Sequence, residues 1–272
     1  MTLIRNKKFK TLVNSIANYT QEKYLGMGNP DSKILLVGSE KALSPTHEED
    51  MIIRNHELLN NHYQWYDIIN HYNYLTDNFD SVILKRGHAF NPFNPLLLAL
   101  IANRVRGKSG HTYYGMQRLI NAYQALNYDP DLRIFSPAFH QNTFSKIFIT
   151  ELSIKTARNQ KAANFNLDEF LRSERYSFLI ENMTYQFFST FKTIILYFGK
   201  NIRYIGNPET AKRLQIINIF NRSLYHSNRT IYRHEQKTIE VYQGLKGPKI
   251  VLCRHLSAGF GMNEALLTAH HF

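Results

Sequence analysis

Short apolar runs recur along the chain, each rich in Val, Ile, Leu and aromatic side chains. Five of them cover residues 33–37, 81–84, 146–149, 193–197 and 249–253. These runs are continuous rather than alternating, which indicates strands that are buried on both faces of a sheet. A sixth run at residues 238–242 lies shortly before the last one and predicts a mixed edge or a hairpin around Gly244 and Gly247.

Longer segments with helical spacing lie between these runs, at residues 51–72, 113–126 and 167–191. In the last segment Phe170, Phe178 and Phe187 recur at multiples near 3.6 residues. Further helix starts are predicted at Asp168 and Pro208. Because strands alternate with helices and no repeat or linker divides the chain, we expect one α/β domain over residues 1–272. It should have three layers around a central, mostly parallel sheet of about four to five strands, with its core over about residues 30–270.

The excess of basic over acidic residues indicates what kind of partner the protein binds. The chain has 33 Lys and Arg against 21 Asp and Glu, a formal net charge of +12. This excess favours a polyanion such as nucleic acid, although an ordinary basic surface is the alternative.

The longest apolar run near the middle, residues 96–102, stops at Asn103, so we expect no membrane partner. A single cysteine, Cys253, and the absence of a signal-peptide pattern favour a cytoplasmic protein, which we expect to be a monomer.

Polar residues follow the predicted strands at their carboxyl ends, which is where ligands bind in open parallel sheets. These are Gly38, Ser39 and Glu40; residues 85–88; Thr150, Glu151, Lys155 and Arg158; Lys200; and Arg254, His255 and Ser257. The pattern predicts an active site with a rim of cations along one edge of the sheet. Each part also has a structural explanation: Glu40 in the first turn of a helix, His255 as a hydrogen-bonded histidine, and Lys155 with Arg158 on a solvated face.

Several known motifs are missing. The glycines at residues 26 and 28 precede a strand instead of following one, so they do not form a dinucleotide-binding turn. Residues 106–110 lack the first glycine and the preceding strand of a phosphate-binding loop. No Gly-x-Ser-x-Gly or His-Glu-x-x-His pattern is present. We therefore expect neither a cofactor nor a metal.

The ends of the predicted sheet resemble a known family. Residues 33–40, Lys-Ile-Leu-Leu-Val-Gly-Ser-Glu, and residues 251–257, Val-Leu-Cys-Arg-His-Leu-Ser, resemble the two signature motifs of the uracil-DNA glycosylase superfamily. Residues 148–152 resemble the segment whose asparagine reads the base, and residues 196–200 resemble its apolar strand followed by Gly-Lys. The Asn-Pro-rich residues 90–95 are similar to a divergent bacterial branch of that superfamily.

The resemblance implies a uracil-DNA glycosylase-like fold, DNA as the partner and no cofactor. It implies a carboxylate near the sugar at Glu40 and a donor to the base oxygen at His255, because cleaving the N-glycosidic bond of a flipped base generates a cationic sugar and an anionic base. The residues implied at the substrate are Gly38, Ser39, Phe90, Phe93, Tyr113, Thr150 and Glu151, and those at the DNA are Lys155, Arg158, Lys200, Arg254, Ser257 and Phe260.

Threonine at position 150 departs from the family pattern, because it lacks the paired donor and acceptor of asparagine. The expected substrate is therefore a damaged or modified base rather than plain uracil. Two other functions remain open. One is a non-catalytic nucleic-acid-binding member of the same fold, and the other is a hydrolase of small nucleosides or nucleotides.

Overall fold

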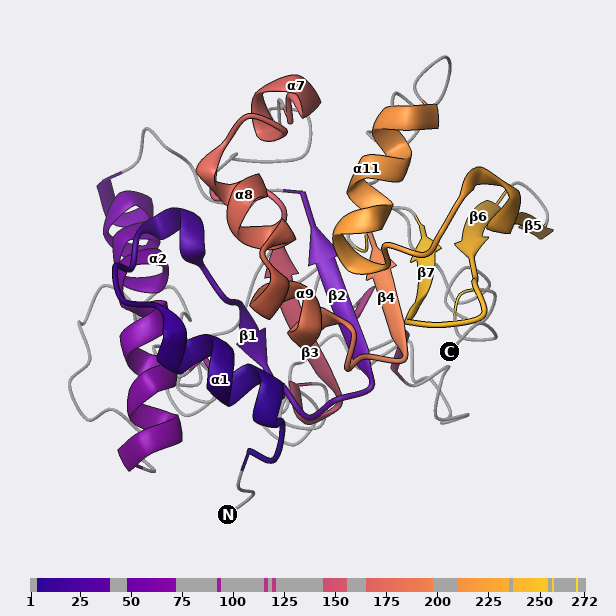
Figure 1. Cartoon of the computed structure of the whole chain (residues 1–272). Coiled ribbons are helices and arrows are strands. Elements are labelled where there is room, and N and C mark those ends of the chain that lie inside the picture. The colour runs from indigo at the N-terminus through magenta and orange to yellow at the C-terminus, as the bar shows by residue number, and fades with distance from the viewer. Residues whose placement is uncertain are drawn as a thin grey trace, which may run out of the picture.

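The computed structural model describes residues 4–39, 48–71, 92–93, 115–116, 119–120, 144–155, 165–197, 210–234, 237–253, 256 and 268. Within them the chain forms an α/β structure around a seven-stranded mixed sheet, in the order β1-β3-β2-β4-β7-β6-β5 (Figure 1). The strands are β1 (Met27–Gly28), β2 (Ile34–Gly38), β3 (Ile147–Glu151), β4 (Thr193–Leu196), β5 (Arg229–His234), β6 (Lys237–Tyr242) and β7 (Lys249–Leu252).

The centre of the sheet is parallel and its two sides are antiparallel. Strands β3, β2, β4 and β7 pair in parallel, and Val37 lies opposite both Thr150 and Leu196. Strand β1 is antiparallel to β3, β6 to β7, and β5 to β6. The runs at residues 33–37, 146–149, 193–197 and 249–253 are therefore confirmed as strands, and residues 238–242 form part of β6.

The sheet nevertheless differs from the one that the sequence predicted. Strands β1 and β5 were not expected, so the sheet is larger than four or five strands and half of its pairings are antiparallel. Strand β1 has only two residues, and β5 reads Arg-Thr-Ile-Tyr-Arg-His, which contains too little apolar sequence to stand out. The predicted strand at residues 81–84 lies outside the described residues.

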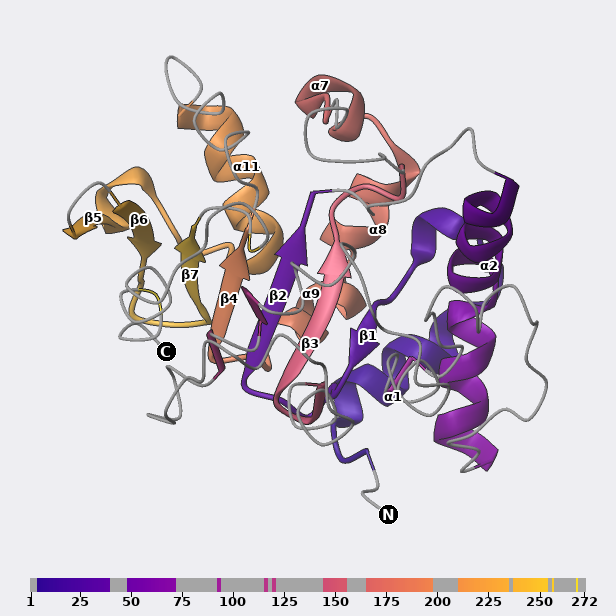
Figure 2. The same ribbon diagram turned by 180° about the vertical axis from the view of Figure 1, so that it is seen from behind.

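Helices cover one face of the sheet, as the views from the two sides show (Figures 1 and 2). They are α1 (Lys7–Ser15), α2 (Glu48–His71), α7 (Leu167–Phe170), α8 (Glu174–Ile180), α9 (Asn182–Phe188) and α11 (Thr210–Phe220), with short 3-10 turns at Gln21–Lys23 and His226–Asn228. The predicted helix at residues 51–72 corresponds to α2. The predicted helix at 167–191 is instead three short helices, because Asn166 and Ser173 each accept backbone N–H groups as N-caps.

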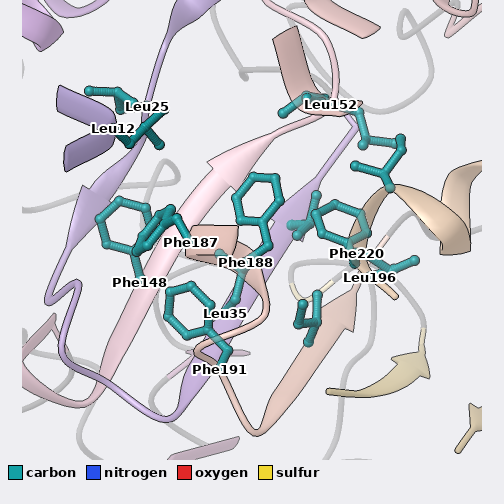
Figure 3. Close-up of a cluster of buried hydrophobic side chains, with 14 of the residues drawn as sticks. Leu12, Leu25, Leu35, Phe148, Leu152, Phe187, Phe188, Phe191, Leu196 and Phe220 are labelled. Carbon is teal, nitrogen blue, oxygen red and sulfur yellow. The ribbon is translucent and has the colours of Figure 1, made fainter. Parts of the chain in front are cut away.

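Aromatic side chains fill the space between these helices and the sheet (Figure 3). The rings of Phe148 on β3 and Phe187 on α9 lie edge to face with their centroids 5.3 Å apart, and Phe188 contacts Phe220 of α11 at 5.1 Å. A second buried cluster lies on the opposite face, where Met116 and its neighbours cover alternate residues of the same strands. Both faces are therefore buried, which explains the continuous apolar runs.

Two glycines hold β1 against β3. Gly26 and Gly28 have φ values of 123° and 98°, which side-chain-bearing residues rarely adopt. Helix α2 secures this turn, because the Asn61 amide accepts from the Leu25 N–H at 3.0 Å and the Trp65 indole donates to the Gly26 carbonyl at 2.9 Å. Gly26 and Gly28, which do not form a dinucleotide-binding turn, therefore allow the edge strand β1 to pair closely with β3.

Replacing Gly26 with alanine should lower the free energy of unfolding by about 2–4 kcal/mol. The new Cβ would combine a disfavoured positive φ with overlap on the Ile149 carbonyl oxygen. The control is Gly244→Ala, where φ is not positive and the nearest atom is the Leu224 methyl at 3.1 Å, and its cost should stay within about 1 kcal/mol. Urea denaturation measures both, and equal midpoints for the two variants would contradict the role of Gly26.

Candidate functional site

The order of the parallel strands defines the place where a ligand is expected. The chain passes from β2 to β3 on one side and then returns to β4 on the other side of β2. From β4 it continues past the position of β7 to β5 at the far edge of the sheet, and it comes back through β6 to β7. The connections that leave β2 and β4 thus lead in opposite directions along the sheet. In open α/β sheets ligands bind beyond the carboxyl ends of the strands at such a reversal. Figure 2 shows β3, β2 and β4 pointing toward this common edge.

A carboxylate lies at this reversal. Glu151 is the last residue of β3, and its side chain packs over Gly38, the last residue of β2. A Cβ at position 38 would displace the Glu151 carboxylate, so glycine allows this group to lie directly against the end of β2. Tyr197, the residue after β4, donates its hydroxyl to Glu151 Oε1 at 3.4 Å. The Glu151 carboxylate therefore lies between the carboxyl ends of the adjacent strands β3, β2 and β4.

The surroundings of Glu151 determine what it can do. Its Oε2 atom is buried, and Tyr197 belongs to the apolar cluster on the face opposite the helices. An ionised carboxylate only accepts hydrogen bonds, so it can bind an amine, orient a water molecule or offset a developing positive charge. Each of these interactions is stronger away from bulk solvent.

A buried arginine fixes the same strand end from the helix side of the sheet. Arg175 of α8 is 1% exposed. One terminal nitrogen donates to the Glu151 carbonyl at 2.6 Å and to the Thr150 hydroxyl at 3.2 Å. The other donates to the carbonyls of Tyr24 at 2.5 Å and Glu22 at 3.0 Å. Burial lowers the pKa of Arg175 to about 10, so the guanidinium remains charged at neutral pH.

Two of the predicted substrate residues stand at the reversal beside Glu151. Gly38 ends β2 and Ser39 follows it, buried, with both carbonyls accepting backbone N–H groups from the chain after β3. The Glu151 carboxylate faces Gly38 and Tyr197, while only its main-chain carbonyl is bound by Arg175.

Thr150, Phe93 and Lys155 occupy other surroundings. The Thr150 hydroxyl accepts a hydrogen bond from Arg175 and the residue is 1% exposed, so this side chain supports the end of β3. Phe93 packs beside Trp65 in the helix-side core, with ring centroids 6.4 Å apart. Lys155 is exposed and forms an ion pair with Glu169 of α7.

The remaining predicted site residues lie outside the described part of the chain. They are Glu40, Phe90, Tyr113, Arg158, Lys200, Arg254, His255, Ser257 and Phe260. Sequence reasoning missed Tyr197 and Arg175. Tyr197 was counted as the end of an apolar run, although its hydroxyl is at the carboxyl end of the strand. Arg175 shares a helix face with Phe178 and Leu179, and a cation in that pattern was the available signal of a buried role.

Comparison with known proteins gives no assignment: no family model and no curated protein matches the chain. Across the described residues no helix has the length and apolar character needed to cross a membrane. In the same residues, no three His, Cys, Asp or Glu side chains lie together in a way that could hold a metal ion.

Removing the Arg175 guanidinium should destabilise the protein strongly. Arg175→Met leaves four acceptor atoms around the end of β3 without this donor, and buried polar groups without partners cost about 1–3 kcal/mol each. We expect a loss of at least about 3 kcal/mol in the free energy of unfolding.

The matched control is Arg172→Met in the same segment. Arg172 is exposed and donates to the Asp168 carbonyl, so its loss should cost under about 1 kcal/mol. Guanidinium chloride denaturation of both variants makes the comparison, and similar costs at positions 172 and 175 would show that Arg175 does not hold the strand end.

Proposed function

We propose that the protein is a DNA glycosylase-like hydrolase that binds DNA and cleaves the N-glycosidic bond of a flipped, damaged or modified base. The observation that carries this proposal is the Glu151 carboxylate, packed on Gly38 and bound by Tyr197 at the reversal of the sheet. The net charge of +12 supports a polyanionic substrate. The resemblance of residues 33–40 and 251–257 to the uracil-DNA glycosylase motifs supports the reaction.

The proposed role of Glu151 is to bind the base. A carboxylate accepts from an exocyclic amine but repels the carbonyl oxygens of uracil. A flipped base with an exocyclic amine would therefore donate to Glu151, whereas uracil has a carbonyl oxygen at that position, which would face the carboxylate as a second acceptor. Sites that leave buried polar groups unpaired discriminate strongly between substrates. This role replaces the one that the sequence suggested for Thr150.

The bond-breaking roles in the proposal belong to Glu40 and His255. A carboxylate at Glu40 would position water and offset the positive charge of the sugar, and His255 would donate to the departing base. Cations along the same edge would hold the phosphates on both sides of the flipped nucleotide. No metal or organic cofactor is needed for this hydrolysis.

Changing Glu151 to glutamine should lower the rate of base release about 10²- to 10³-fold while leaving DNA affinity unchanged, because the side chain keeps its size but loses its charge. The assay uses duplexes that each carry one modified base, with abasic sites scored by alkaline cleavage. Amine-bearing bases should be the best substrates.

The control for this variant is Glu169→Gln, which removes one charge from an exposed carboxylate on α7. Its rate should match the wild type. If Glu151→Gln released bases as fast as Glu169→Gln, or if uracil were the best substrate, Glu151 would not be the group that reads the base.

Binding of the wild-type protein to DNA should weaken steeply as salt rises, because each neutralised phosphate releases counterions. Fluorescence anisotropy of a short labelled duplex over a salt series measures the effect. An affinity independent of salt, or no binding at about 50 mM salt, would contradict the proposal. Salt-dependent binding without base release from any duplex would favour the non-catalytic alternative.

A further inference from the structure

Strands β5 and β6 form a two-stranded ribbon that extends past its neighbour. The two strands pair over all six of their residues, from Arg229 opposite Tyr242 to His234 opposite Lys237. Strand β6 pairs with β7 only over its last three residues, Glu240 to Tyr242. The first half of β6 therefore continues beyond the last residue of β7, at the carboxyl edge of the sheet. In Figure 1 this ribbon lies at the opposite side of the molecule from α1.

Cations gather on the side of the ribbon that faces α11. Residues opposite one another in an antiparallel pair share a face, so Arg229, Ile231 and Arg233 lie on the same face as Glu240. Arg213 of α11 donates to Glu240 Oε2 at 2.6 Å, and Arg229 donates to the same oxygen at 2.8 Å. This hydrogen bond raises the pKa of Arg229.

The charges of this cluster do not balance. Among the side chains that the structure describes on this face, Arg213, Arg229 and Arg233 carry three positive charges and Glu240 carries one negative charge, which gives 3 − 1 = +2. Glu240 orients two of the arginines, and Arg233 is exposed two positions beyond Ile231 on the same face. Arg229 and Arg233 are about 13 Å apart along the strand, a distance that equals about four base-pair steps along the axis of DNA.

Exposed apolar side chains belong to β5 and to the segment that leads into it. Ile231 is 42% exposed on the arginine face, and Tyr225, shortly before β5, is 68% exposed. The Tyr225 backbone is held in place because its N–H donates to the Asn228 side chain at 2.8 Å. Exposed aromatic groups next to aligned arginines are typical of surfaces that bind nucleic acid without reading its sequence.

We propose that the α11-facing side of the β5–β6 ribbon binds the phosphate backbone of DNA, two strands away from β4 at the carboxyl edge of the sheet. This inference rests on the proposed function for the identity of its partner. Glu240 holds Arg229 in a fixed orientation, so less side-chain freedom is lost on binding, and Arg233 contacts a neighbouring phosphate. A two-stranded ribbon also has the dimensions that the major groove admits.

The experiment compares Arg233→Gln with Lys7→Gln. Both variants remove one exposed positive charge, but Lys7 lies on α1 at the other side of the sheet. Affinity for a short fluorescent DNA duplex is measured by anisotropy over a salt series, and thermal unfolding confirms that each variant is folded. Arg233→Gln should weaken binding roughly fivefold or more at low salt and reduce the salt slope by about one. Lys7→Gln should leave both values near those of the wild type.

The possible negative results of this binding experiment lead to different conclusions. If the wild type binds DNA with a steep salt dependence but the two variants behave alike, the ribbon is not the contact surface, while DNA binding stands. If the wild type does not bind DNA at all, the proposed function fails together with the inference. If polyglutamate competes as well as unlabelled DNA, the ribbon is a docking surface for acidic proteins, and the assignment to DNA is overturned.

Discussion

The buried guanidinium of Arg175 is the interaction on which the site depends. It joins the segment before β1, through the carbonyls of Glu22 and Tyr24, to the end of β3. A charged group is expensive to remove from water, and here several oxygen atoms replace its hydration. Because the Glu151 carbonyl is one of them, Arg175 fixes the main chain from which the Glu151 side chain extends over Gly38. The fold and the acidic group are thus coupled through one cation.

Different interactions stabilise the two edges of the sheet. At β1, glycines allow the chain to approach β3 closely, and α2 secures the turn through Asn61 and Trp65. At the other side a ribbon of polar strands extends the sheet, and an ion-pair cluster between Arg213 and Glu240 ties it to α11. The parallel centre supplies the buried core, while the antiparallel additions supply the charged and hydrogen-bonded parts of the surface.

The central strands could be predicted because a strand buried on both faces carries a continuous apolar run, and β2, β3, β4 and β7 each contain one of at least three residues. Strand β1 could not, since its pairing depends on Asn61 and Trp65 far along the chain. The sequence predicted that Gly38, Ser39, Thr150 and Glu151 end or follow neighbouring strands at one edge of the sheet, but it did not predict their contacts. Neighbouring residues of a strand face opposite ways, and the sequence does not state which of Thr150 and Glu151 faces α8. In the structure Thr150 faces α8, where its hydroxyl accepts a hydrogen bond from Arg175, a residue that lies 25 positions further along the chain.

The outer edge of β5 has a further physical consequence. Among the described residues no strand lies beyond β5, and the free backbone groups of an edge strand can pair with another protein chain, which leads to aggregation. Arg229 and Arg233 oppose such pairing, because two copies that met edge to edge would bring like charges together. The cations proposed to attract DNA would thus also oppose edge-to-edge association of the free protein, so a substitution at either arginine would act on both properties.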